Sequence, residues 1–485
     1  MKVMLLFPPK GFTSKDPLPP LGLLYIASIL EKEGILVEVV DASLERYRWR
    51  DLKVRYLESN PDIVGITTLT EFCFESFKAG QLAKEVLPDC TVVVGGPHSS
   101  FCPEDVLTHI PYVDIVLRGE GEYAFLELCK ALGSSKNLRK ILGISYRDND
   151  RIIHNPPLPL IDDLDRLPFP ARHLLPMEKY NFRLFVPGKG LVPATHMMTS
   201  RGCPFRCSFC ITSKLLGKVW RSRSPGNVIR EVEDIVENFE INTIWFYDDV
   251  FTMSRQRTIE ICDLILERKL NINFTCSIRV DTVDKELLTK MKEAGCFKVF
   301  FGVESGSQRI LDRVCGKKIT IEQVRRLSGW LDELGIIKNP GYIISFPGET
   351  YQDASKTMEL IKEIGGEVSL SLLKIYPGTK IEDIAKQKGI LPKNFSWSKR
   401  QARLGLSLPA AHGSAPIFVD RLSWDEISQI IAEWAQIREV SVFRWIPMVV
   451  KGLRSWLDVV RIASIGRRYL VQKAKRLFKG TQLIK

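Results

Sequence analysis

Residues 199–210 read TSRGCPFRCSFC, and this stretch places three of the eleven cysteines within eight positions. The three are Cys203, Cys207 and Cys210, in the spacing C-x3-C-x2-C. The other eight are scattered singly between residues 73 and 315, where a free cysteine commonly serves as a small core residue. The group at 203–210 therefore requires a separate explanation.

Three interpretations of this group are open: a zinc site, an iron–sulfur cluster and a chance grouping. Structural zinc takes four ligands, usually as two pairs. No second cysteine pair follows at zinc-finger spacing, and His196 lies seven residues upstream within an expected strand. An iron–sulfur cube has four iron corners held by thiolates, so three thiolates would leave one iron open to a small molecule. The loop position after a strand favours the cluster.

Around this loop, residues 191–388 alternate strand and helix signals. Ser224 and Pro225 form an N-cap and first-turn pair before one helix, and Gly295 ends another. This pattern predicts a partial (β/α)6 barrel, whose chemistry lies at the carboxyl ends of its strands. The cysteine loop follows the first strand at that end. The expected strands are 194–200, 243–249, 273–278, 298–305, 341–346 and 368–378.

The N-terminal residues 1–135 show a second alternation, with short runs rich in Val and Ile. Runs that are apolar on both faces indicate a parallel sheet covered by helices on either side. We therefore expect an α/β fold with a flavodoxin-like N-terminal sheet, which binds ligands beyond the carboxyl ends of its strands. The expected strands are 3–7, 37–40, 62–67, 91–96 and 113–117.

Residues 136–190 are rich in proline, which predicts an extended connector between the two domains. Residues 389–485 lose the strand signals and are expected to be helical. Residues 440–485 contain eleven Lys and Arg against one acid, a net charge of +10 out of +12 for the whole chain. The basicity is therefore local to the end of the sequence.

The basic tail has two equally open interpretations. Aromatic side chains interleaved with cations are typical of a helix on an anionic membrane surface, and they also suit a helix pair packed on the barrel with a solvated basic face. No recognised nucleic-acid motif accompanies them, and we expect no nucleic acid partner. The sequence has no long apolar run and no signal-peptide pattern, which predicts a cytoplasmic protein, with contact at the membrane periphery under the first interpretation.

The motif C-x3-C-x-Phe-C, with Phe209 before the last cysteine, resembles the signature of the radical S-adenosylmethionine enzymes. The resemblance implies a [4Fe-4S] cluster on the three cysteines, whose open iron binds S-adenosylmethionine and whose electron releases a 5′-deoxyadenosyl radical. It also implies contacts to S-adenosylmethionine from residues in the cysteine motif and at the ends of the following strands. These are Phe209, Asp248, Asp249, Arg279, Glu304, Ser305 and Ser345, the last standing where a glycine is usual.

Each of these polar side chains also has an ordinary structural interpretation. The pair Asp248–Asp249 suits a helix N-cap, Arg279 suits a surface ion pair, and Glu304 suits a hydrogen bond at the barrel mouth. Their common position after successive expected strands is what favours a shared site.

The N-terminal sheet ahead of this barrel resembles the cobalamin-binding subclass of the same family. Thr67-x-Leu69 and Gly95-Gly96 are similar to its Ser-x-Leu and Gly-Gly elements, and RGEGE at 118–122 matches its loop, which adds Gly119, Glu120 and Gly121 to the expected cobalamin contacts. The Asp-x-His-x-x-Gly element is missing, which implies cobalamin bound without a protein imidazole. His98 at the same edge is expected to be a loop hydrogen bonder. The alternative is a degenerate sheet that only packs or docks substrate.

Together these resemblances imply a cobalamin-dependent radical enzyme, with C-methylation at an unactivated carbon of a small-molecule or lipid-like substrate as the expected reaction. An electron donor of the flavodoxin or ferredoxin type is implied as partner, and no general acid or base is nominated. Two alternatives stay open. One is a radical cyclisation or oxidation without methyl transfer, like the anaerobic cyclase of bacteriochlorophyll synthesis, and the other is a non-catalytic corrinoid or metal carrier.

Overall fold

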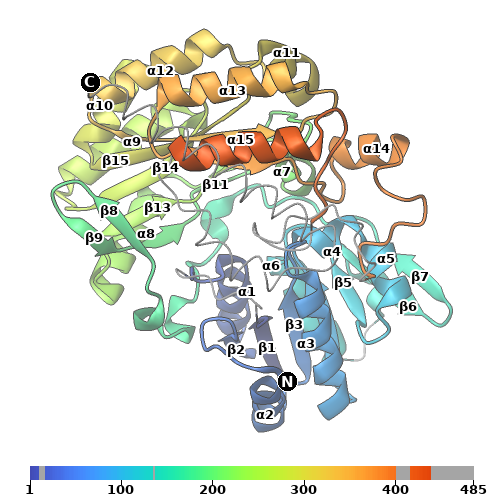
Figure 1. Ribbon diagram of the computed structural model, residues 1–485. Helices are drawn as coiled ribbons and strands as arrows, with labels where there is room; N and C mark the ends of the chain where they lie inside the picture. The colour runs from blue at the N-terminus through green and yellow to red at the C-terminus, as the bar shows by residue number, and fades with distance from the viewer. Residues whose placement is uncertain (10–16, 135–136, 400–414, 438–485) are drawn as a thin grey trace, which may run out of the picture.

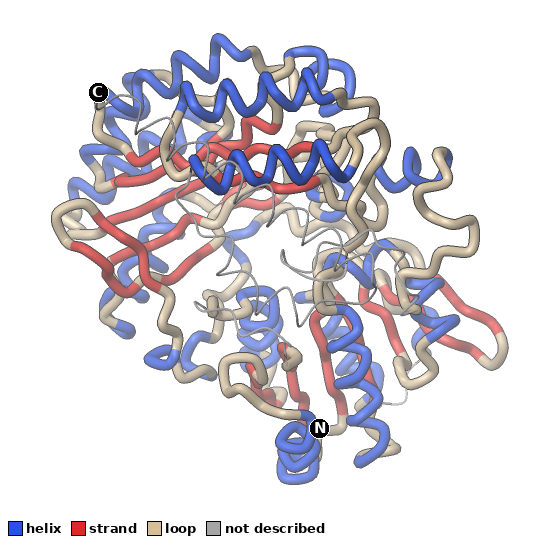
Figure 2. The backbone as a smooth tube through the Cα atoms, viewed as in Figure 1, coloured by secondary structure: helices blue, strands red, loops and turns tan. Residues whose placement is uncertain are grey.

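The chain folds into two α/β units joined by a connector, and the computed structural model describes residues 1–9, 17–134, 137–399 and 415–437 (Figure 1). The N-terminal unit lies in the lower part of the view and the barrel in the upper part. Figure 2 shows their strands as separate groups, each with its own helices.

The N-terminal sheet has the order β2-β1-β3-β4-β5-β6-β7, and its first five strands are parallel, as expected for a flavodoxin-like sheet. Both faces of β1 are apolar because Val3 and Leu5 enter one core while Met4 and Leu6 enter the other. Helices α1 and α6 cover the first face, and α2, α3 and α5 cover the second. The elements are β1 (Lys2–Phe7), α1 (Leu21–Lys32), β2 (Leu36–Asp41), α2 (Trp49–Ser59), β3 (Ile63–Thr67), α3 (Cys73–Val86), β4 (Thr91–Gly95), α4 (Pro97–Phe101), α5 (Pro103–His109), β5 (Ile115–Leu117) and α6 (Glu122–Leu132).

Two strands that the sequence analysis did not predict extend this sheet. β6 (Ile144–Asp148) and β7 (Arg151–His154) form an antiparallel hairpin whose turn contains Asn149 at a φ of 54°. The hairpin falls inside residues 136–190, where we expected only a connector. Its strands are only five and four residues long and range from buried to exposed without strict alternation, so they carry little periodic hydrophobic signal, and the prolines begin only after them.

The barrel contains the six expected parallel strands, in the order β10-β13-β14-β15-β16-β17. Alternate residues of β15 point outward into one core shared with the helices, and the others point toward the barrel interior. The strands are β10 (Thr195–Met197), β13 (Thr243–Phe246), β14 (Asn273–Ile278), β15 (Cys296–Glu304), β16 (Ile337–Ile344) and β17 (Ser369–Leu372). The helices are α7 (Thr212–Leu215), α8 (Pro225–Phe239), α9 (Arg255–Glu267), α10 (Lys285–Glu293), α11 (Gln308–Ile310), α12 (Ile321–Glu333), α13 (Tyr351–Ile364) and α14 (Lys380–Gln387).

After the barrel, α15 (Trp424–Ile437) packs beside α13 on its outer surface (Figure 1). Ile417, just before this helix, forms an antiparallel bridge with Lys374 at the end of the last strand. The predictions for the basic tail at 440–485 lie outside the described residues. Within the described ranges, no helix combines the length and the hydrophobicity that crossing a bilayer requires.

The connector is held to the barrel by a buried ion pair. Arg172, in the 3-10 turn Arg172–Leu174, lies 2.7 Å from Glu231 of α8, and the two side chains are 1% and 0% exposed. Arg223 pairs with the same carboxylate. Because water cannot reach these charges, each depends on its partners for solvation.

We therefore expect the substitution Arg172→Leu to lower the free energy of unfolding by about 3–5 kcal/mol, because it leaves the Glu231 carboxylate buried with only one cation. Arg166→Ala is the matched control in the same connector, since Arg166 is 77% exposed and its loss should cost about 0.5 kcal/mol or less. Urea unfolding followed by circular dichroism measures both. Equal unfolding midpoints for the two variants would contradict this role of Arg172.

Candidate active site

The cysteine loop occupies residues 202–220, immediately after the first barrel strand. Its two ends pair antiparallel as β11 (Ser200–Arg201) and β12 (Arg221–Ser222), so the loop closes on itself. Gly202 has a φ of +87°, and a Cβ there would lie 2.4 Å from the Val219 carbonyl oxygen, which makes glycine necessary at the start of the loop.

The three cysteines of the loop differ from all the others in exposure. Cys203, Cys207 and Cys210 are partly exposed, whereas the eight scattered cysteines are buried, and none of the eleven forms a disulfide. The eight thus serve as core residues, as predicted. Burial raises the pKa of the Cys203 thiol to about 11 and also raises that of Cys207, which the charge of Lys317 partly opposes. Metal coordination would supply the positive charge that thiolates need here.

The trio is not arranged as a site for one metal ion. Among the described residues, no three His, Cys, Asp or Glu side chains lie close enough together to hold a single ion. In an iron–sulfur cluster each thiolate binds a different iron, so its ligands need not converge on one point. Three thiolates without a fourth protein ligand in the motif fit a cluster with one open iron better than structural zinc, which takes four ligands.

Asp248 holds the segment that leads into the cysteine loop. Its carboxylate accepts hydrogen bonds from the backbone N–H groups of Thr199 at 2.6 Å and Ser200 at 3.1 Å, and from both side-chain hydroxyls. The carboxylate of the next residue, Asp249, is open to solvent and accepts a bond from Thr212 Oγ1 at 3.1 Å. Partial desolvation by the surrounding chain raises the pKa of the Asp249 carboxyl group, and the charge of Asp248 raises it further.

This arrangement separates the two predicted S-adenosylmethionine contacts. Asp248 has its oxygens occupied by the chain, so Asp249 has the carboxylate that is better placed to meet a ligand. Neither residue caps a helix, because α9 is capped by Ser254, whose hydroxyl accepts from Arg257 N–H. The N-cap alternative for this pair is therefore wrong.

Arg279 and Glu304 lie beside the cysteine loop from neighbouring strands. The Arg279 guanidinium stacks 3.7 Å from the centroid of Phe205, within the loop, and pairs with Asp281 at 2.6 Å. It is buried, so the surface ion-pair alternative is wrong. Glu304 accepts a hydrogen bond from Lys317 Nζ at 2.6 Å, and both side chains are nearly buried.

Lys317 was not predicted from the sequence, since it belongs to no motif. It follows the turn at Leu311–Cys315, whose Cys315 carbonyl accepts a bond from Ser208 N–H at 3.0 Å in the cysteine loop. The fold thus brings Lys317 to the loop across a long sequence separation.

The remaining predicted contacts have structural partners. Phe209 meets Phe346 edge to face at 5.9 Å, just after β16. Ser305 is completely buried, and its Oγ accepts a bond from Ser307 N–H at 3.1 Å. Ser345 has a φ of +75°, which explains why a glycine suits its position, and its hydroxyl donates to the Phe418 carbonyl at 2.6 Å. Direct contact of these three with S-adenosylmethionine stays a prediction.

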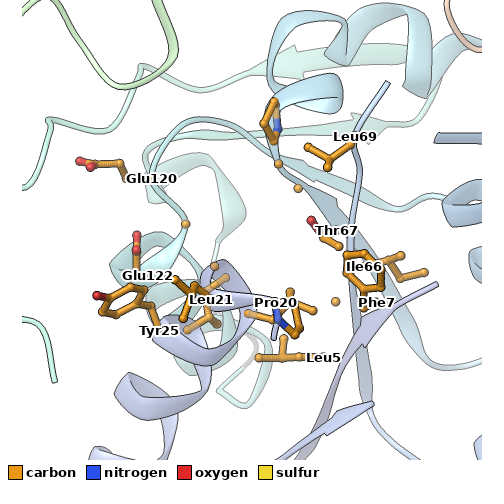
Figure 3. A pocket seen from close by; sticks show the side chains of 18 of the residues that line it. Leu5, Phe7, Pro20, Leu21, Tyr25, Ile66, Thr67, Leu69, Glu120 and Glu122 are labelled. Atoms are coloured by element: carbon orange, nitrogen blue, oxygen red, sulfur yellow. The ribbon is translucent and has the colours of Figure 1, made fainter. Parts of the chain in front are cut away.

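A cavity of about 600 Å³ lies between the N-terminal sheet and the barrel. Figure 3 shows Thr67 and Leu69 on one side of it and Glu120 and Glu122 on the opposite side. All seven residues that we predicted for cobalamin line this cavity: Thr67, Leu69, Gly95, Gly96, Gly119, Glu120 and Gly121. The barrel contributes His196, Met198, Arg201, Leu215, Leu216 and Tyr247.

The glycines allow the chain to turn tightly at the cavity edge. Gly96 has a φ of +99°, and a Cβ on it would lie 2.8 Å from the Thr68 carbonyl oxygen. His98 is buried behind this edge and lies 3.1 Å from Thr70 Oγ1, so it is a loop hydrogen bonder, as predicted. The largely apolar cavity wall with this glycine edge fits the corrin ring and nucleotide tail of a cobalamin.

On the barrel side of the cavity, His196 is a polar group that the sequence analysis gave no role. Its side chain is buried, its ring meets Tyr247 edge to face at 5.5 Å, and Nδ1 has no hydrogen-bond partner among the described residues. Burial and the charge of Arg172 lower its pKa to about 3, so the imidazole stays neutral. A neutral imidazole can offer a hydrogen bond inside the cavity without adding a charge.

Two family models match the chain in the two units described above. The model of the radical SAM superfamily matches residues 197–361, and that of the B12 binding domain matches residues 11–129. The first range contains the cysteine loop and most of the barrel, and the second contains four of the seven strands of the N-terminal sheet, β2 to β5.

Similar proteins and structures share this two-unit organisation. An uncharacterized methyltransferase of Pyrococcus horikoshii is 37% identical over 404 residues, which cover 82% of this chain and 86% of that protein. The anaerobic magnesium-protoporphyrin IX monomethyl ester cyclase of Rubrivivax gelatinosus is 32% identical over 388 residues, covering 79% and 68%. The structure of the radical S-adenosylmethionine methyltransferase TsrM from Kitasatospora setae, with cobalamin and a [4Fe-4S] cluster bound, has the same fold, with a TM-score of 0.71, 19% identity, and coverage of 90% and 88%.

Cys207→Ala should abolish incorporation of the cluster, because two thiolates cannot hold a cube that needs three protein ligands. Iron and sulfide analysis after anaerobic reconstitution measures the loss. Cys90→Ala is the matched control, since Cys90 is a buried core cysteine of the other unit, and this variant should keep its iron and sulfide. Full iron content in Cys207→Ala would exclude the proposed ligand set.

Gly96→Ala should weaken cobalamin binding by about ten-fold, or about 1.4 kcal/mol, because the added Cβ forces the cavity edge away from Thr68. Gly34→Ala is the control, because Gly34 also has a positive φ, of +74°, but a Cβ there meets nothing within 4 Å. Absorbance titration with hydroxocobalamin measures both affinities. The assignment of this edge to the corrinoid fails if the two variants bind equally well.

Proposed function

The chain belongs to the cobalamin-dependent radical S-adenosylmethionine enzymes, and we propose that it transfers a methyl group from S-adenosylmethionine to a carbon atom of a small-molecule substrate. The cofactors of this family are a [4Fe-4S] cluster, S-adenosylmethionine and cobalamin. One observation carries the proposal: a single cavity is lined both by every predicted corrinoid contact and by barrel residues in and next to the cysteine loop.

When bound, the cluster with S-adenosylmethionine supplies a radical that can take hydrogen from an unactivated carbon, and the corrinoid supplies the methyl group. The residues of the chain would position the cofactors and exclude water from them. Cys203, Cys207 and Cys210 would hold the cluster, while Asp248 fixes the segment leading into their loop. Our proposed contacts for the amino and carboxylate groups of S-adenosylmethionine are Asp249 and Arg279.

The substrate would lie against the barrel side of the cavity. Tyr247 is 48% exposed there and the His196 imidazole is neutral, so together they offer an uncharged aromatic surface. Both groups are uncharged and the cavity wall is largely apolar, which suits an apolar substrate with a polar group. A lipid-like substrate agrees with this wall.

Cleavage of S-adenosylmethionine consumes one electron, and we infer a donor of the flavodoxin or ferredoxin type for it. Contact of the basic tail with a membrane surface stays a prediction, since residues 440–485 lie outside the described residues.

A second candidate is a radical cyclisation or oxidation without methyl transfer. The similarity to an anaerobic magnesium-protoporphyrin IX monomethyl ester cyclase, at 32% identity over 388 residues, favours it specifically. The third candidate from the sequence, a non-catalytic corrinoid or metal carrier, is disfavoured by the cysteine loop, because a corrinoid carrier has no use for a cluster with one open iron.

Anaerobic incubation of the reconstituted protein with hydroxocobalamin, S-adenosylmethionine and a chemical reductant separates the three. A methyltransferase should form both S-adenosylhomocysteine, from methyl donation, and 5′-deoxyadenosine, from radical formation. Chromatography with mass detection quantifies both. A cyclase should form 5′-deoxyadenosine without S-adenosylhomocysteine, and a carrier should form neither. Cys207→Ala is the control, since it should lose 5′-deoxyadenosine.

A further inference from the structure

We infer that Glu120 and Glu122 are positioning residues that hold the cysteine loop against the corrinoid cavity, so that occupancy of the two cofactor sites is coupled. This inference rests on the proposed function. It also assigns Glu120 a different part from direct contact with cobalamin, which the sequence pattern had implied for it.

Four buried charges connect the two sites. Arg201 of β11 pairs with Glu120 at 3.1 Å and with Glu122 at 2.6 Å, and Arg221 of β12 pairs with Glu120 at 2.9 Å. The four side chains are between 2% and 8% exposed. Because water and salt do not reach them, these pairs are far less screened than pairs at a surface.

The carboxylate of Glu120 is fully occupied by these partners. Oε1 accepts from Arg201 and Arg221 at 3.1 and 3.0 Å, and Oε2 accepts from Arg221 and from the Ile161 N–H at 2.9 and 2.8 Å. Four donors saturate a carboxylate, so little capacity is left for a corrinoid amide.

The loop at 119–122 therefore presents two different surfaces. Its glycines face the cavity with backbone, and a Cβ on Gly119 would meet nothing within 4 Å. Its glutamates reach the arginines of the barrel hairpin. A ligand that contacts Gly119 or Gly121 therefore contacts the same short segment whose glutamates, Glu120 and Glu122, form ion pairs with that hairpin.

The arginines are the paired ends of the cysteine loop. Arg201 and Arg221 face each other in the antiparallel register of β11 and β12, and the three cysteines lie between them. Arg201 also lies 5.3 Å from the ring of Tyr25, a cavity-lining residue of α1. Two glutamates on two arginines fix the orientation of the hairpin as well as its position. Movement of residues 119–122 would thus shift Arg201 and Arg221, which stand at the two ends of the loop that carries the three cysteines.

Coupling of this kind is reciprocal: if cobalamin tightens the binding of S-adenosylmethionine, then S-adenosylmethionine tightens cobalamin by the same factor. A merely structural role predicts something else. Loss of a structural ion pair would weaken or destabilise both sites but would leave the ratio of affinities with and without the other ligand unchanged.

The test measures the dissociation constant of S-adenosylmethionine for the cluster-loaded protein, with and without saturating hydroxocobalamin. In the wild type, cobalamin should tighten binding by about five-fold or more. In Glu122→Gln, which removes one ion pair and keeps the side-chain shape, the factor should fall below about two-fold. Glu38→Gln is the control, because Glu38 pairs with Arg55 within the same unit but on the far strand β2, and it should keep the wild-type factor.

The outcomes distinguish this inference from the proposed function. A wild type that binds both ligands with no change in affinity overturns the coupling alone, and so does a Glu122→Gln variant with the wild-type factor. A wild type that takes up a cluster but no corrinoid overturns the proposed function and the coupling with it.

A second measurement needs no variant and covers the case in which Glu122→Gln does not fold. Hydrogen exchange of the wild type should slow in residues 203–210 of the hairpin when hydroxocobalamin binds, although none of these residues lines the corrinoid cavity. Unchanged exchange in the hairpin, with slowing confined to the N-terminal sheet, would refute the inference.

Discussion

The buried ion pairs between the N-terminal unit and the cysteine hairpin are the constraint on which the site depends. Almost no solvent reaches the side chains of Glu120, Glu122, Arg201 and Arg221. Each of these charges is therefore stabilised by an opposite charge of the other unit. Removing one partner of such a buried pair typically costs about 3–5 kcal/mol. The two units are thus held in one relative position, and a cavity can be built from both. Apolar packing would also hold them together, but it would not fix the angle of the hairpin.

The same principle operates throughout the site, where charges that look functional are often neutralised by the chain itself. Asp248 is used by the backbone of Thr199 and Ser200, and Glu304 is used by Lys317. The Asp249 carboxylate and the three thiols of the cysteine loop are more open, since these side chains are exposed or partly exposed. An unpaired charge buried in a low-dielectric site is costly in free energy, so this arrangement limits the number of such charges in the protein without its cofactors.

The cavity is built jointly by the two units of the chain. A flavodoxin-like sheet and a partial barrel both bind ligands at the carboxyl ends of their strands. Here the two ends border one volume, since residues after β3, β4 and β5 line the cavity together with His196 of β10 and Tyr247 after β13. At the end of β16, the Ser345 hydroxyl donates a hydrogen bond to the Phe418 carbonyl, and this bond joins the segment before α15 to the barrel.

The local order of residues is enough to predict the alternation of strands and helices, the cysteine loop and the glycine-containing edge that lines the cavity. These features depend on hydrophobic periodicity, glycine geometry and motif spacing, which act over a few residues. The hairpin of β6 and β7 was not predicted because such short strands, with burial that does not alternate strictly, leave a weak periodic signal. The part played by Glu120, the buried state of Arg279 and the presence of Lys317 at Cys207 could not be foreseen either. Each results from contacts between segments far apart in the chain, either within the barrel or between the two units, and a side chain's burial and partners exist only once those segments have packed together.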